Sequence, residues 1–269
     1  MTNYTVTGSI VLHNNAGTIE NTLRTLKEYT LGVPFQLFLI DCASSDDSMA
    51  LAKEAFPGAI KLPNEKNIGF GAGHNLALPL LRSKYHAIIN PDVLLDSDAI
   101  TTMAKYMDEH PDVVLLSPRI VFPETGRDQI LGKRNPTVRY LIASRMREEE
   151  PSDLLREYAM LDADRDAPFE IENATGCFML VRTEAFRAVG GFDERYFLYF
   201  EDCDLTRSLG KLGKTLYYPG AVVQHVWGRE SKKNAWLTLV QIHSMVKYFR
   251  KWRLRRGSSA VPQQNKDHV

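Results

Sequence analysis

Short apolar runs separated by amphipathic stretches constrain the fold of this chain more than any other feature. Continuous apolar runs of strand length occur at residues 6–12, 35–40, 85–89 and 113–117. Strands that are apolar on both faces are typical of a sheet covered by helices on both sides. The pattern therefore predicts an α/β fold with a mostly parallel central sheet.

Helix signals fill the segments between these runs. Thr18 can cap a helix that begins at Ile19, and Ser97 or Asp98 can cap another that ends at Asp108. Further helices are predicted at residues 49–55, 76–81, 183–189 and 205–212, and further strands at 60–62, 177–181 and 216–226. Residues 119–170 fit the alternation poorly, so an irregular insertion is expected there.

Composition and charge narrow the class of protein. The 269 residues are 44% hydrophobic and 25% charged, with a formal net charge of zero. This fits one large domain, alone or with an appendage, and provides no overall field for nucleic acid. The charge is uneven, because residues 148–172 carry ten acidic and two basic side chains, whereas residues 229–256 carry nine basic side chains and one glutamate. The basic end suggests a local partner, and solvated faces are the alternative.

Cysteine usage and hydropathy bear on the compartment. Cys42, Cys177 and Cys203 lack paired spacing, which favours small buried core residues over disulfides or a thiolate zinc site. The N-terminus lacks signal-peptide features, and no apolar run reaches the ~18 residues of a membrane span. A cytoplasmic protein, soluble or peripherally attached to a membrane, is expected.

Polar residues follow the apolar runs where a ligand would bind. In parallel α/β sheets, ligands bind outside the carboxyl ends of the strands. The side chains predicted to share this edge are Asn14, Asn15, Asp41, Ser44, Asn90 and Asp92. Chance placement of polar turn residues is the alternative, since every strand must end in something polar.

A glycine-rich segment precedes the helix predicted at 76–81. It reads NIGFGAGHN from Asn67 to Asn75 and includes Gly69, Gly71 and His74. Glycines allow close backbone approach, and a helix N-terminus favours phosphate. A phosphate-facing loop and a tight structural turn are both open.

Two residues at strand ends could bind a divalent metal. Asp92 follows the run at 85–89, and His225 ends the strand predicted at 216–226. Mg²⁺ and Mn²⁺ often use one or two protein carboxylates, with diphosphate oxygens and water completing the shell. An Asp in a turn and a structural His are the alternatives.

Carboxylates end the aromatic run at residues 196–200. Glu201, Asp202 and Asp204 follow it directly, and the small-residue turn Thr175-Gly176 precedes the neighbouring strand. Buried carboxylates need partners or a chemical task. One of them can act as a general base that removes the proton of an acceptor hydroxyl, and capping of the next helix is the alternative.

Residues 236–256 have helical apolar spacing with many basic residues. Leu239, Ile242, Val246 and Phe249 follow this spacing, and Trp236 and Trp252 add aromatic anchors. The flanking basic residues are Lys247, Arg250, Lys251, Arg253, Arg255 and Arg256. The pattern is typical of a helix at an anionic membrane surface. A helix packed on the domain with a solvated basic face is the alternative.

Several segments together resemble the family-2 glycosyltransferases of the GT-A fold, and within them the bacterial rhamnosyltransferase-like enzymes of O-antigen and cell-wall assembly. The matching segments, in the family's order, are SIVLHNNAGTIENTL (9–23), LIDCASSDDS (39–48), NIGFGAGHN (67–75), NPDVLL (90–95), ATGCFMLVRTEAFRAVGGFDERYFLYFEDCDLTRSLGKLG (174–213) and HVWGRES (225–231). The resemblance implies a Rossmann-like nucleotide-sugar half at 1–118 and an acceptor half at 119–228. A basic helical appendage at 229–256 and a disordered tail at 257–269 would follow.

The resemblance also implies roles for individual residues. Asp202, with Glu201 beside it, would be the catalytic base, and Asp92 with His225 would bind Mg²⁺ or Mn²⁺. Here Asn90 replaces the first acid of the family's D-x-D element, which places more weight on Asp92 and His225. The nucleotide-sugar contacts would be Asn14, Asp41, Ser44, Asn67, Gly69, Gly71, His74, Asn75 and Asn90. The acceptor or sugar contacts would be Thr175, Gly176, Asp204 and Trp227.

The implied reaction is inverting and uses dTDP-L-rhamnose as donor and an undecaprenyl-diphosphate-linked saccharide as acceptor. A UDP- or GDP-sugar donor remains an alternative. No Q-x-x-R-W motif is present, which argues against a processive synthase. A nucleotidyltransferase would need a basic loop near residues 13–18, where there is no Lys or Arg. A non-catalytic scaffold is the third possibility, although the candidate acids are present.

Overall fold

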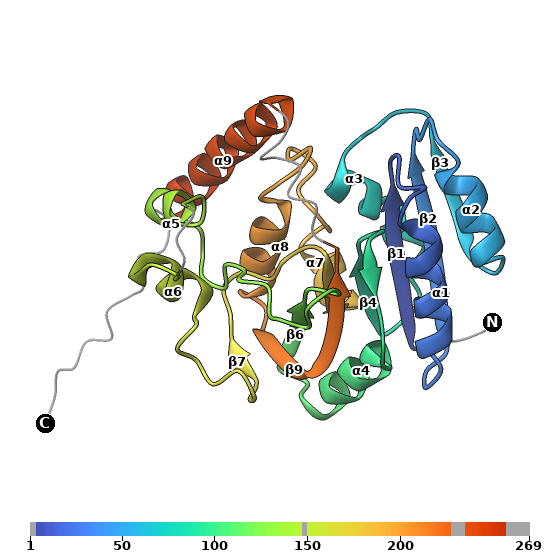
Figure 1. Ribbon diagram of the computed structural model, residues 1–269, viewed down its shortest axis with the longest axis horizontal. Helices are drawn as coiled ribbons and strands as arrows, with labels where there is room; N and C mark the ends of the chain where they lie inside the picture. Colours follow the sequence, from blue (N-terminus) through green and yellow to red (C-terminus); the bar gives the residue numbers. More distant parts are fainter. Residues whose placement is uncertain (1–3, 147–149, 227–234, 257–269) are drawn as a thin grey trace, which may run out of the picture.

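The computed structural model describes residues 4–146, 150–226 and 235–256 of the chain. Within these residues, one sheet of nine strands has helices on both of its faces (Figure 1). The predicted α/β class with a central sheet is confirmed. The predicted contact Trp227 and the tail at 257–269 lie outside the described residues.

The N-terminal half contains the parallel part of the sheet. Its strands lie in the order β3-β2-β1-β4 and are all parallel. The chain moves outward from β1 to β3 and then returns to the other side of β1, so the carboxyl ends of β1 and β4 flank a switch point. The elements of this half are β1 (Val6–Leu12), α1 (Ile19–Tyr29), β2 (Phe35–Cys42), α2 (Ser48–Ala55), β3 (Ile60–Asn64), α3 (Phe70–Asn75), η1 (Leu78–Leu80) and β4 (Tyr85–Ile89).

The second half of the sheet is mixed, not mostly parallel as predicted. Strand β8 lies antiparallel between β4 and β6, whereas β9 is parallel to β6. The short strands β5 and β7 both pair antiparallel with β9. The elements are β5 (Val93–Leu94), α4 (Ala99–Glu109), β6 (Val113–Val121), α5 (Val138–Ala143), α6 (Asp153–Ala159), β7 (Phe169–Glu170), β8 (Phe178–Arg182), α7 (Thr183–Ala188), α8 (Glu201–Leu209), β9 (Lys214–His225) and α9 (Ala235–Arg256).

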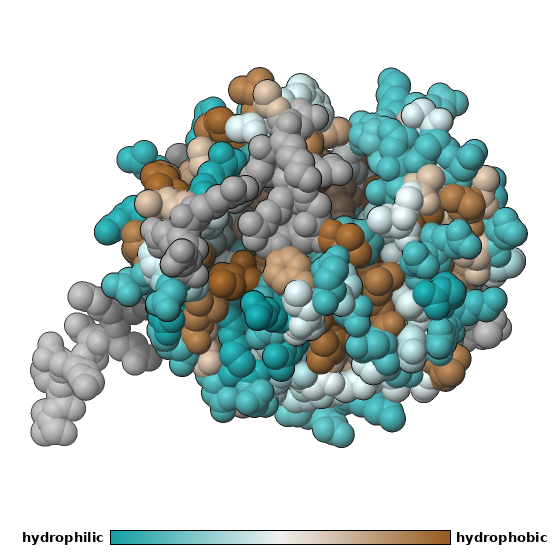
Figure 2. Space-filling model, viewed as in Figure 1, coloured by the Kyte–Doolittle hydropathy of each residue, from teal (hydrophilic) through white to brown (hydrophobic). Residues whose placement is uncertain are grey.

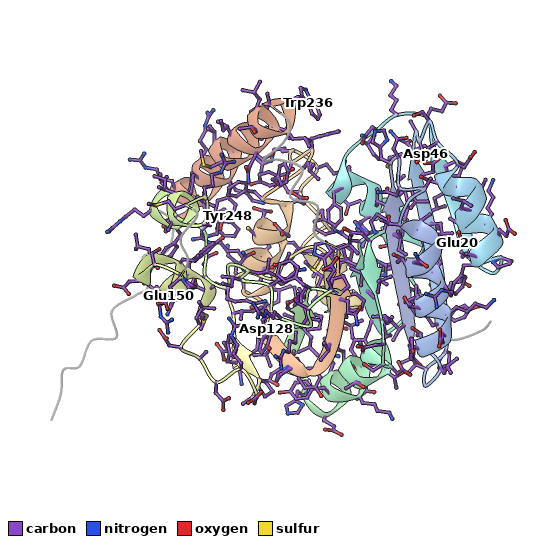
Figure 3. The ribbon with its side chains drawn as sticks, in the orientation of Figure 1. Glu20, Asp46, Asp128, Glu150, Trp236 and Tyr248 are labelled. Atoms are coloured by element: carbon purple, nitrogen blue, oxygen red, sulfur yellow. The ribbon has the colours of Figure 1, made fainter. Side chains whose placement is uncertain are left out.

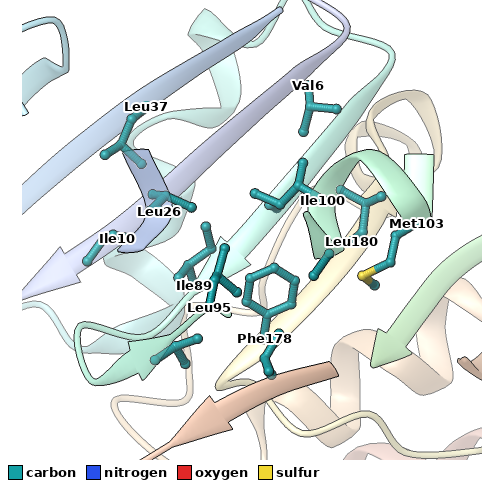
Figure 4. Packing of buried hydrophobic residues seen from close by; sticks show 14 of the residues in the cluster. Val6, Ile10, Leu26, Leu37, Ile89, Leu95, Ile100, Met103, Phe178 and Leu180 are labelled. Carbon is teal, nitrogen blue, oxygen red and sulfur yellow. The ribbon is translucent and has the colours of Figure 1, made fainter. Parts of the chain in front are cut away.

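The apolar strands are buried on both faces, as their sequences predicted. On one face, Ile10 and Phe178 of the sheet pack with Leu26 of α1 and Ile100 of α4 (Figure 4). On the other face, Ile88 and Met179 pack with Phe186 of α7 and Leu205 of α8. The three cysteines are buried and free, as expected.

Helix α3 begins six residues before the helix predicted at 76–81. Its glycines permit close packing: a Cβ at Gly71 would lie 2.8 Å from Cβ of Phe192, and one at Gly73 would lie 2.8 Å from Val11. Gly71 is therefore buried in the first turn of a helix, and its contact with a phosphate stays a prediction.

The segment at 119–170, expected to be irregular apart from a helix-like stretch at 137–147, contains two short helices. Thr137 caps α5 by accepting a hydrogen bond from the Tyr140 N–H, and Ser152 precedes α6. Tyr140 and Tyr158 stack across the two helices with ring centroids 5.0 Å apart. Helices this short depend on tertiary packing, which explains why the sequence pattern did not show α6.

Helix α9 is fastened to the domain by buried charge. The Asp204 carboxylate of α8 accepts hydrogen bonds from Lys251 Nζ at 2.6 Å and from Trp252 Nε1 at 2.8 Å. Asp193 also pairs with Lys251 at 2.7 Å, and Tyr248 packs on the same side of α9 (Figure 3). Asp204, Lys251 and Trp252 are thus structural, because they are buried against one another. The predicted contact of Asp204 with the acceptor is wrong for this reason. The predicted contact of Lys251 and Trp252 with a membrane is wrong for the same reason.

Within the described residues, no helix is long and apolar enough to cross a membrane.

The anchor of α9 predicts a large stability effect. Asp204→Ala should lower the free energy of unfolding by about 3 kcal/mol, because Lys251 and Trp252 lose a buried partner. Urea unfolding measures this change. The matched control is Asp162→Ala, which removes an exposed ion pair with Arg156 and should cost within about 1 kcal/mol. Equal effects of the two substitutions would contradict the anchoring role.

Candidate functional site

The polar residues after β1 and β2 meet at the carboxyl edge of the sheet, as predicted. The Asp41 carboxylate accepts a hydrogen bond from the Ser44 N–H at 3.1 Å, and the Asn14 N–H donates to Ser44 Oγ at 3.1 Å. Asn14 in turn accepts from the Ser45 N–H at 2.8 Å. Asn14 and Ala43 both have left-handed backbone conformations (φ 61° and 57°), which bend the two loops toward each other. This edge presents partly exposed amide, hydroxyl and carboxylate groups.

The turn at Asn67–Gly69 contacts the second half of the molecule. Asn67 Oδ1 accepts from the Gly69 N–H at 3.0 Å, and the Phe70 N–H donates to Phe197 O at 3.0 Å. Gly69 has φ +88°, and a Cβ there would lie 2.0 Å from Phe197 O. Only glycine fits this close approach.

His74 and Asn75 lie away from the polar edge. The His74 ring is fully buried and bonds to Ser9 Oγ at 2.6 Å, and Ser9 also bonds to His86 at 2.9 Å. Burial lowers the pKa of His74 well below its ordinary value and that of His86 to about 3. Asn75 bonds to both backbone groups of Phe192. His74 Nε2 is buried without a hydrogen-bond partner, and Asn75 is partly exposed. That these two residues contact the donor stays a prediction.

Asp92 and His225, the predicted metal ligands, are neighbours. The antiparallel pairing of β5 with β9 sets Val93 opposite His225, which places His225 Nε2 3.4 Å from Asp92 Oδ1. That distance is long for a hydrogen bond, and Asp92 Oδ1 is buried without a hydrogen-bond partner. Burial lowers the pKa of His225, but Cys177 and Asp92 outweigh it and raise the pKa to about 10.

Gln129 holds the His225 ring, and sequence reasoning did not find it. Its Nε2 donates to His225 O at 2.6 Å, and its Oε1 lies 3.2 Å from His225 Nδ1. An oxygen partner at Nδ1 places the ring proton there and leaves Nε2 directed at Asp92. Gln129 follows β6 in the segment without a hydrophobic pattern, so nothing in the sequence marked it.

A single turn connects the metal-ligand candidates to Asp202. The Asn90 N–H donates to Cys177 O at 2.8 Å, and the adjacent Gly176 N–H donates to Asp202 Oδ2 at 3.0 Å. The other carboxylate oxygen of Asp202 accepts from the Cys203 N–H at 2.8 Å. Asn90 and Asp202, far apart in sequence, therefore contact consecutive residues of one turn.

Glu201 and Asp202 lie in the first turn of α8, inside the helix. The predicted start at Leu205 is four residues late, and neither Asp202 nor Asp204 is the N-cap. Burial raises the pKa of both Glu201 and Asp202, and Glu201 Oε2 has no hydrogen-bond partner. Tyr199 and Phe200, directly before them, both have φ 69°, a strained conformation for bulky residues that is typical of functional sites.

A cavity of about 870 Å³ opens on the catalytic side. Its lining includes Thr175, Glu201 and Asp202 together with Tyr158 and Asn173. Asn14, Asp41, Asp92 and His225 are not among its lining residues. The cavity is therefore separate from the polar edge of β1 and β2.

Two curated relatives match this chain over more than half of its length. Over 219 residues the chain is 30% identical to N-acetylglucosaminyl-diphospho-decaprenol L-rhamnosyltransferase of Mycobacterium tuberculosis, which takes in 71% of this chain and 66% of the relative. It is 28% identical over 159 residues to rhamnosyltransferase WbbL of Escherichia coli. This match covers 56% of this chain and 57% of the relative. The chain thus matches just under two thirds, or less, of each relative's length.

Solved structures share the fold at low identity. GalNAc-T7, solved with UDP, GalNAc and Mn²⁺, superposes with a TM-score of 0.63 over 84% of this chain and 44% of that one, at 15% identity. The mannosyltransferase PcManGT of Pyrobaculum calidifontis, solved with GDP-Man and Mn²⁺, gives 0.58 over 85% and 59%, at 16% identity. These likenesses support the GT-A-type fold.

The family model for glycosyl transferase family 2 matches residues 9–190. The match contains the β1 and β2 edge, Asn90, Asp92 and the turn at 175–177. It covers more than half of the chain, so this protein belongs to glycosyl transferase family 2.

Proposed function

We propose that the protein transfers one deoxyhexose, L-rhamnose from dTDP-L-rhamnose, to a lipid-linked glycan of bacterial surface polysaccharide, with inversion at the anomeric carbon. The observation that carries this proposal is the turn at 175–177, which joins Asp202 to the edge that holds Asn90 and Asp92. A base and a diphosphate site must be adjacent for direct transfer. The two rhamnosyltransferase relatives support the choice of sugar and of a lipid-linked acceptor.

Asp202 is the base in this proposal. Its two carboxylate oxygens are held by the Gly176 and Cys203 N–H groups, which fixes its direction and leaves lone pairs for an acceptor hydroxyl. That hydroxyl gives its proton to Asp202 while its oxygen attacks the anomeric carbon, and the bond from that carbon to the nucleoside diphosphate breaks. Glu201, whose pKa is raised by burial, lies beside Asp202 in the first turn of α8 and hydrogen-bonds to the acceptor.

The polar edge of β1 and β2 binds the nucleoside. Asp41 accepts a hydrogen bond from the pyrimidine base, and the linked Asn14 and Ser44 shape the loop around it. Asn67 and Gly69 contact the nucleoside from the turn before α3. Thr175 and Gly176 lie on the acceptor side of the transferred sugar.

Asp92 and His225 fit a divalent metal ion, Mg²⁺ or Mn²⁺. The buried, unpartnered Asp92 Oδ1 supplies one ligand. The adjacent His225 imidazole supplies the second once the ion displaces the proton that its raised pKa retains. No group of three or more His, Cys, Asp or Glu side chains suited to a metal occurs among the described residues. Diphosphate oxygens and water would complete the shell, and the bound ion would stabilise the departing diphosphate.

The role of Gln129 predicts a metal-binding phenotype. Gln129→Leu should weaken Mn²⁺ binding by 10- to 100-fold, because the His225 ring loses its Nδ1 partner. Electron paramagnetic resonance of free Mn²⁺ measures the affinity. The control is Gln224→Leu in β9, whose side chain bonds to Asp96 instead. Unchanged Mn²⁺ affinity in Gln129→Leu would remove the positioning role.

Donor identity is tested by thermal shift with Mn²⁺ or Mg²⁺ present. A donor at 100 times its dissociation constant should stabilise the protein by about 2.7 kcal/mol, or several degrees in a chain of this size. We expect a metal-dependent shift with dTDP-L-rhamnose and not with UDP-glucose, UDP-galactose or GDP-mannose. A shift with one of those donors alone would show that L-rhamnose is not the transferred sugar. No shift with any donor would favour a non-catalytic scaffold.

The base assignment predicts separate effects on turnover and binding. Asp202→Asn should lower turnover by roughly 10²- to 10⁴-fold with little change in donor affinity. In the wild type, burial raises the pKa of Asp202, so turnover should fall as the pH drops through a value above the ordinary 3.8 and should be fully present above it. Asp96→Asn, at an exposed position after β5, is the control. Near-normal turnover in Asp202→Asn would exclude it as the base.

A further inference from the structure

The apolar stripe of α9 is exposed. Leu239, Ile242 and Val246 are 65%, 46% and 46% exposed, whereas Tyr248 and Trp252 on the opposite side are buried. The stripe lies on one face because these residues follow the helical repeat. It is therefore not the face that fastens the helix, and its exposure is unexplained by packing.

Helix α5 and the turn after it extend this apolar surface. Val138, Ile142 and Met146 are each more than half exposed. Arg145 bonds through Nη2 to Gln241 Oε1 of α9, and Leu141 packs on the cluster that contains Tyr248. In Figure 2, hydrophobic side chains lie among hydrophilic ones at the upper left, over α9 and α5. Two segments far apart in sequence thus form one surface.

Part of this surface forms the mouth of the cavity that Asp202 lines. Val138, Ile142, Met146 and Ile242 line the cavity, and so do Glu201 and Asp202. The exposed members mark its mouth, and Glu201, only 5% exposed, marks its floor. Glu201 Oε2 is buried without a hydrogen-bond partner, and a buried carboxyl without a partner indicates a ligand that has polar groups.

Charged side chains line the cavity between its polar floor and its apolar mouth. Arg145 lines the cavity beside Ile142 and Met146, and Glu150 is the acidic residue on the wall near it. Arg250 and Arg253 continue the exposed face of α9 beyond Val246. The cavity thus has carboxyl groups on its floor, a guanidinium on its wall and aliphatic side chains at its mouth. These groups match an elongated amphiphile with hydroxyls at one end, an anionic group in the middle and an apolar chain at the other end. A flat bilayer would meet the mouth but could not reach Glu201.

We propose that this cavity binds the acceptor as a sugar diphosphate on an isoprenoid chain. The sugar lies at Glu201 and Asp202, the diphosphate pairs with Arg145, and the first isoprene units lie on Ile142, Met146 and Ile242. This inference rests on the proposed function and assigns the lipid part of the acceptor to α5 and α9 of this chain.

Binding of farnesyl diphosphate to the full chain tests the inference. Titration calorimetry is carried out in EDTA, so that metal-dependent diphosphate binding at Asp92 and His225 does not contribute. We expect farnesyl diphosphate to bind at least tenfold more tightly than inorganic diphosphate or farnesol. Ile142→Asp and Ile242→Asp should each weaken it about tenfold, because apolar burial is lost, and Arg145→Gln should reduce binding to the level of farnesol.

Leu31→Asp is the matched control, since Leu31 is an exposed leucine in the turn after α1. It should leave farnesyl diphosphate binding unchanged, and all variants should keep the wild-type thermal shift with dTDP-L-rhamnose. Equal binding of farnesyl and inorganic diphosphate, or equal effects of Ile142→Asp and Leu31→Asp, would overturn the inference.

Vesicles of phosphatidylethanolamine and phosphatidylglycerol provide the second readout. Loss of vesicle binding in Ile142→Asp and Ile242→Asp, with farnesyl diphosphate binding intact, would make the surface a bilayer contact and overturn the cavity assignment. If the wild-type protein binds farnesyl diphosphate but shows no thermal shift with any nucleotide-sugar donor, the proposed donor is refuted and the lipid site is not. The failure of the proposed function and the failure of this inference are therefore distinguishable.

Discussion

The hydrogen bond from the Gly176 N–H to Asp202 is the interaction on which the catalytic side of the molecule depends. Gly176 lies against the Asp202 side chain, with its Cβ position 3.3 Å from Asp202 Cβ. The next residue, Cys177, accepts from Asn90 and begins the approach to β8. Strand β8 lies between β4 and β6, so the turn before it lies between the two halves of the sheet. Sheet topology therefore brings the carboxylate to the polar edge.

A second constraint is the buried charge at Asp204. Its bonds to Lys251 and Trp252 hold α9 beside α8, and the Arg145–Gln241 contact brings α5 against α9. Three segments thereby enclose the cavity above Asp202. A carboxylate two residues from Asp202, the proposed base, thus holds two helices together. Neighbouring acids in one helical turn can differ in their contacts because they point to different sides.

How far the sequence could predict the site depends on whether a residue's role is local. The edge formed by Asn14, Asp41 and Ser44 was predictable, because the carboxyl ends of parallel strands always meet at one side of the sheet. The contacts of His74 with Ser9 and of Asn75 with Phe192 could not be predicted, because they join segments far apart in the chain. Gln129 was missed, because its role arises only from its contact with His225, 96 residues away.

The sequence by itself determined the α/β class, the buried strands and the polar edge, because these follow from periodicity and from where strands end. Tertiary structure alone decided which glycines pack against side chains and which acids pair with cations. It also decided that β8 runs antiparallel and that α5 joins α9. Each of these depends on contacts between distant segments, and such contacts leave no periodic signal in the chain.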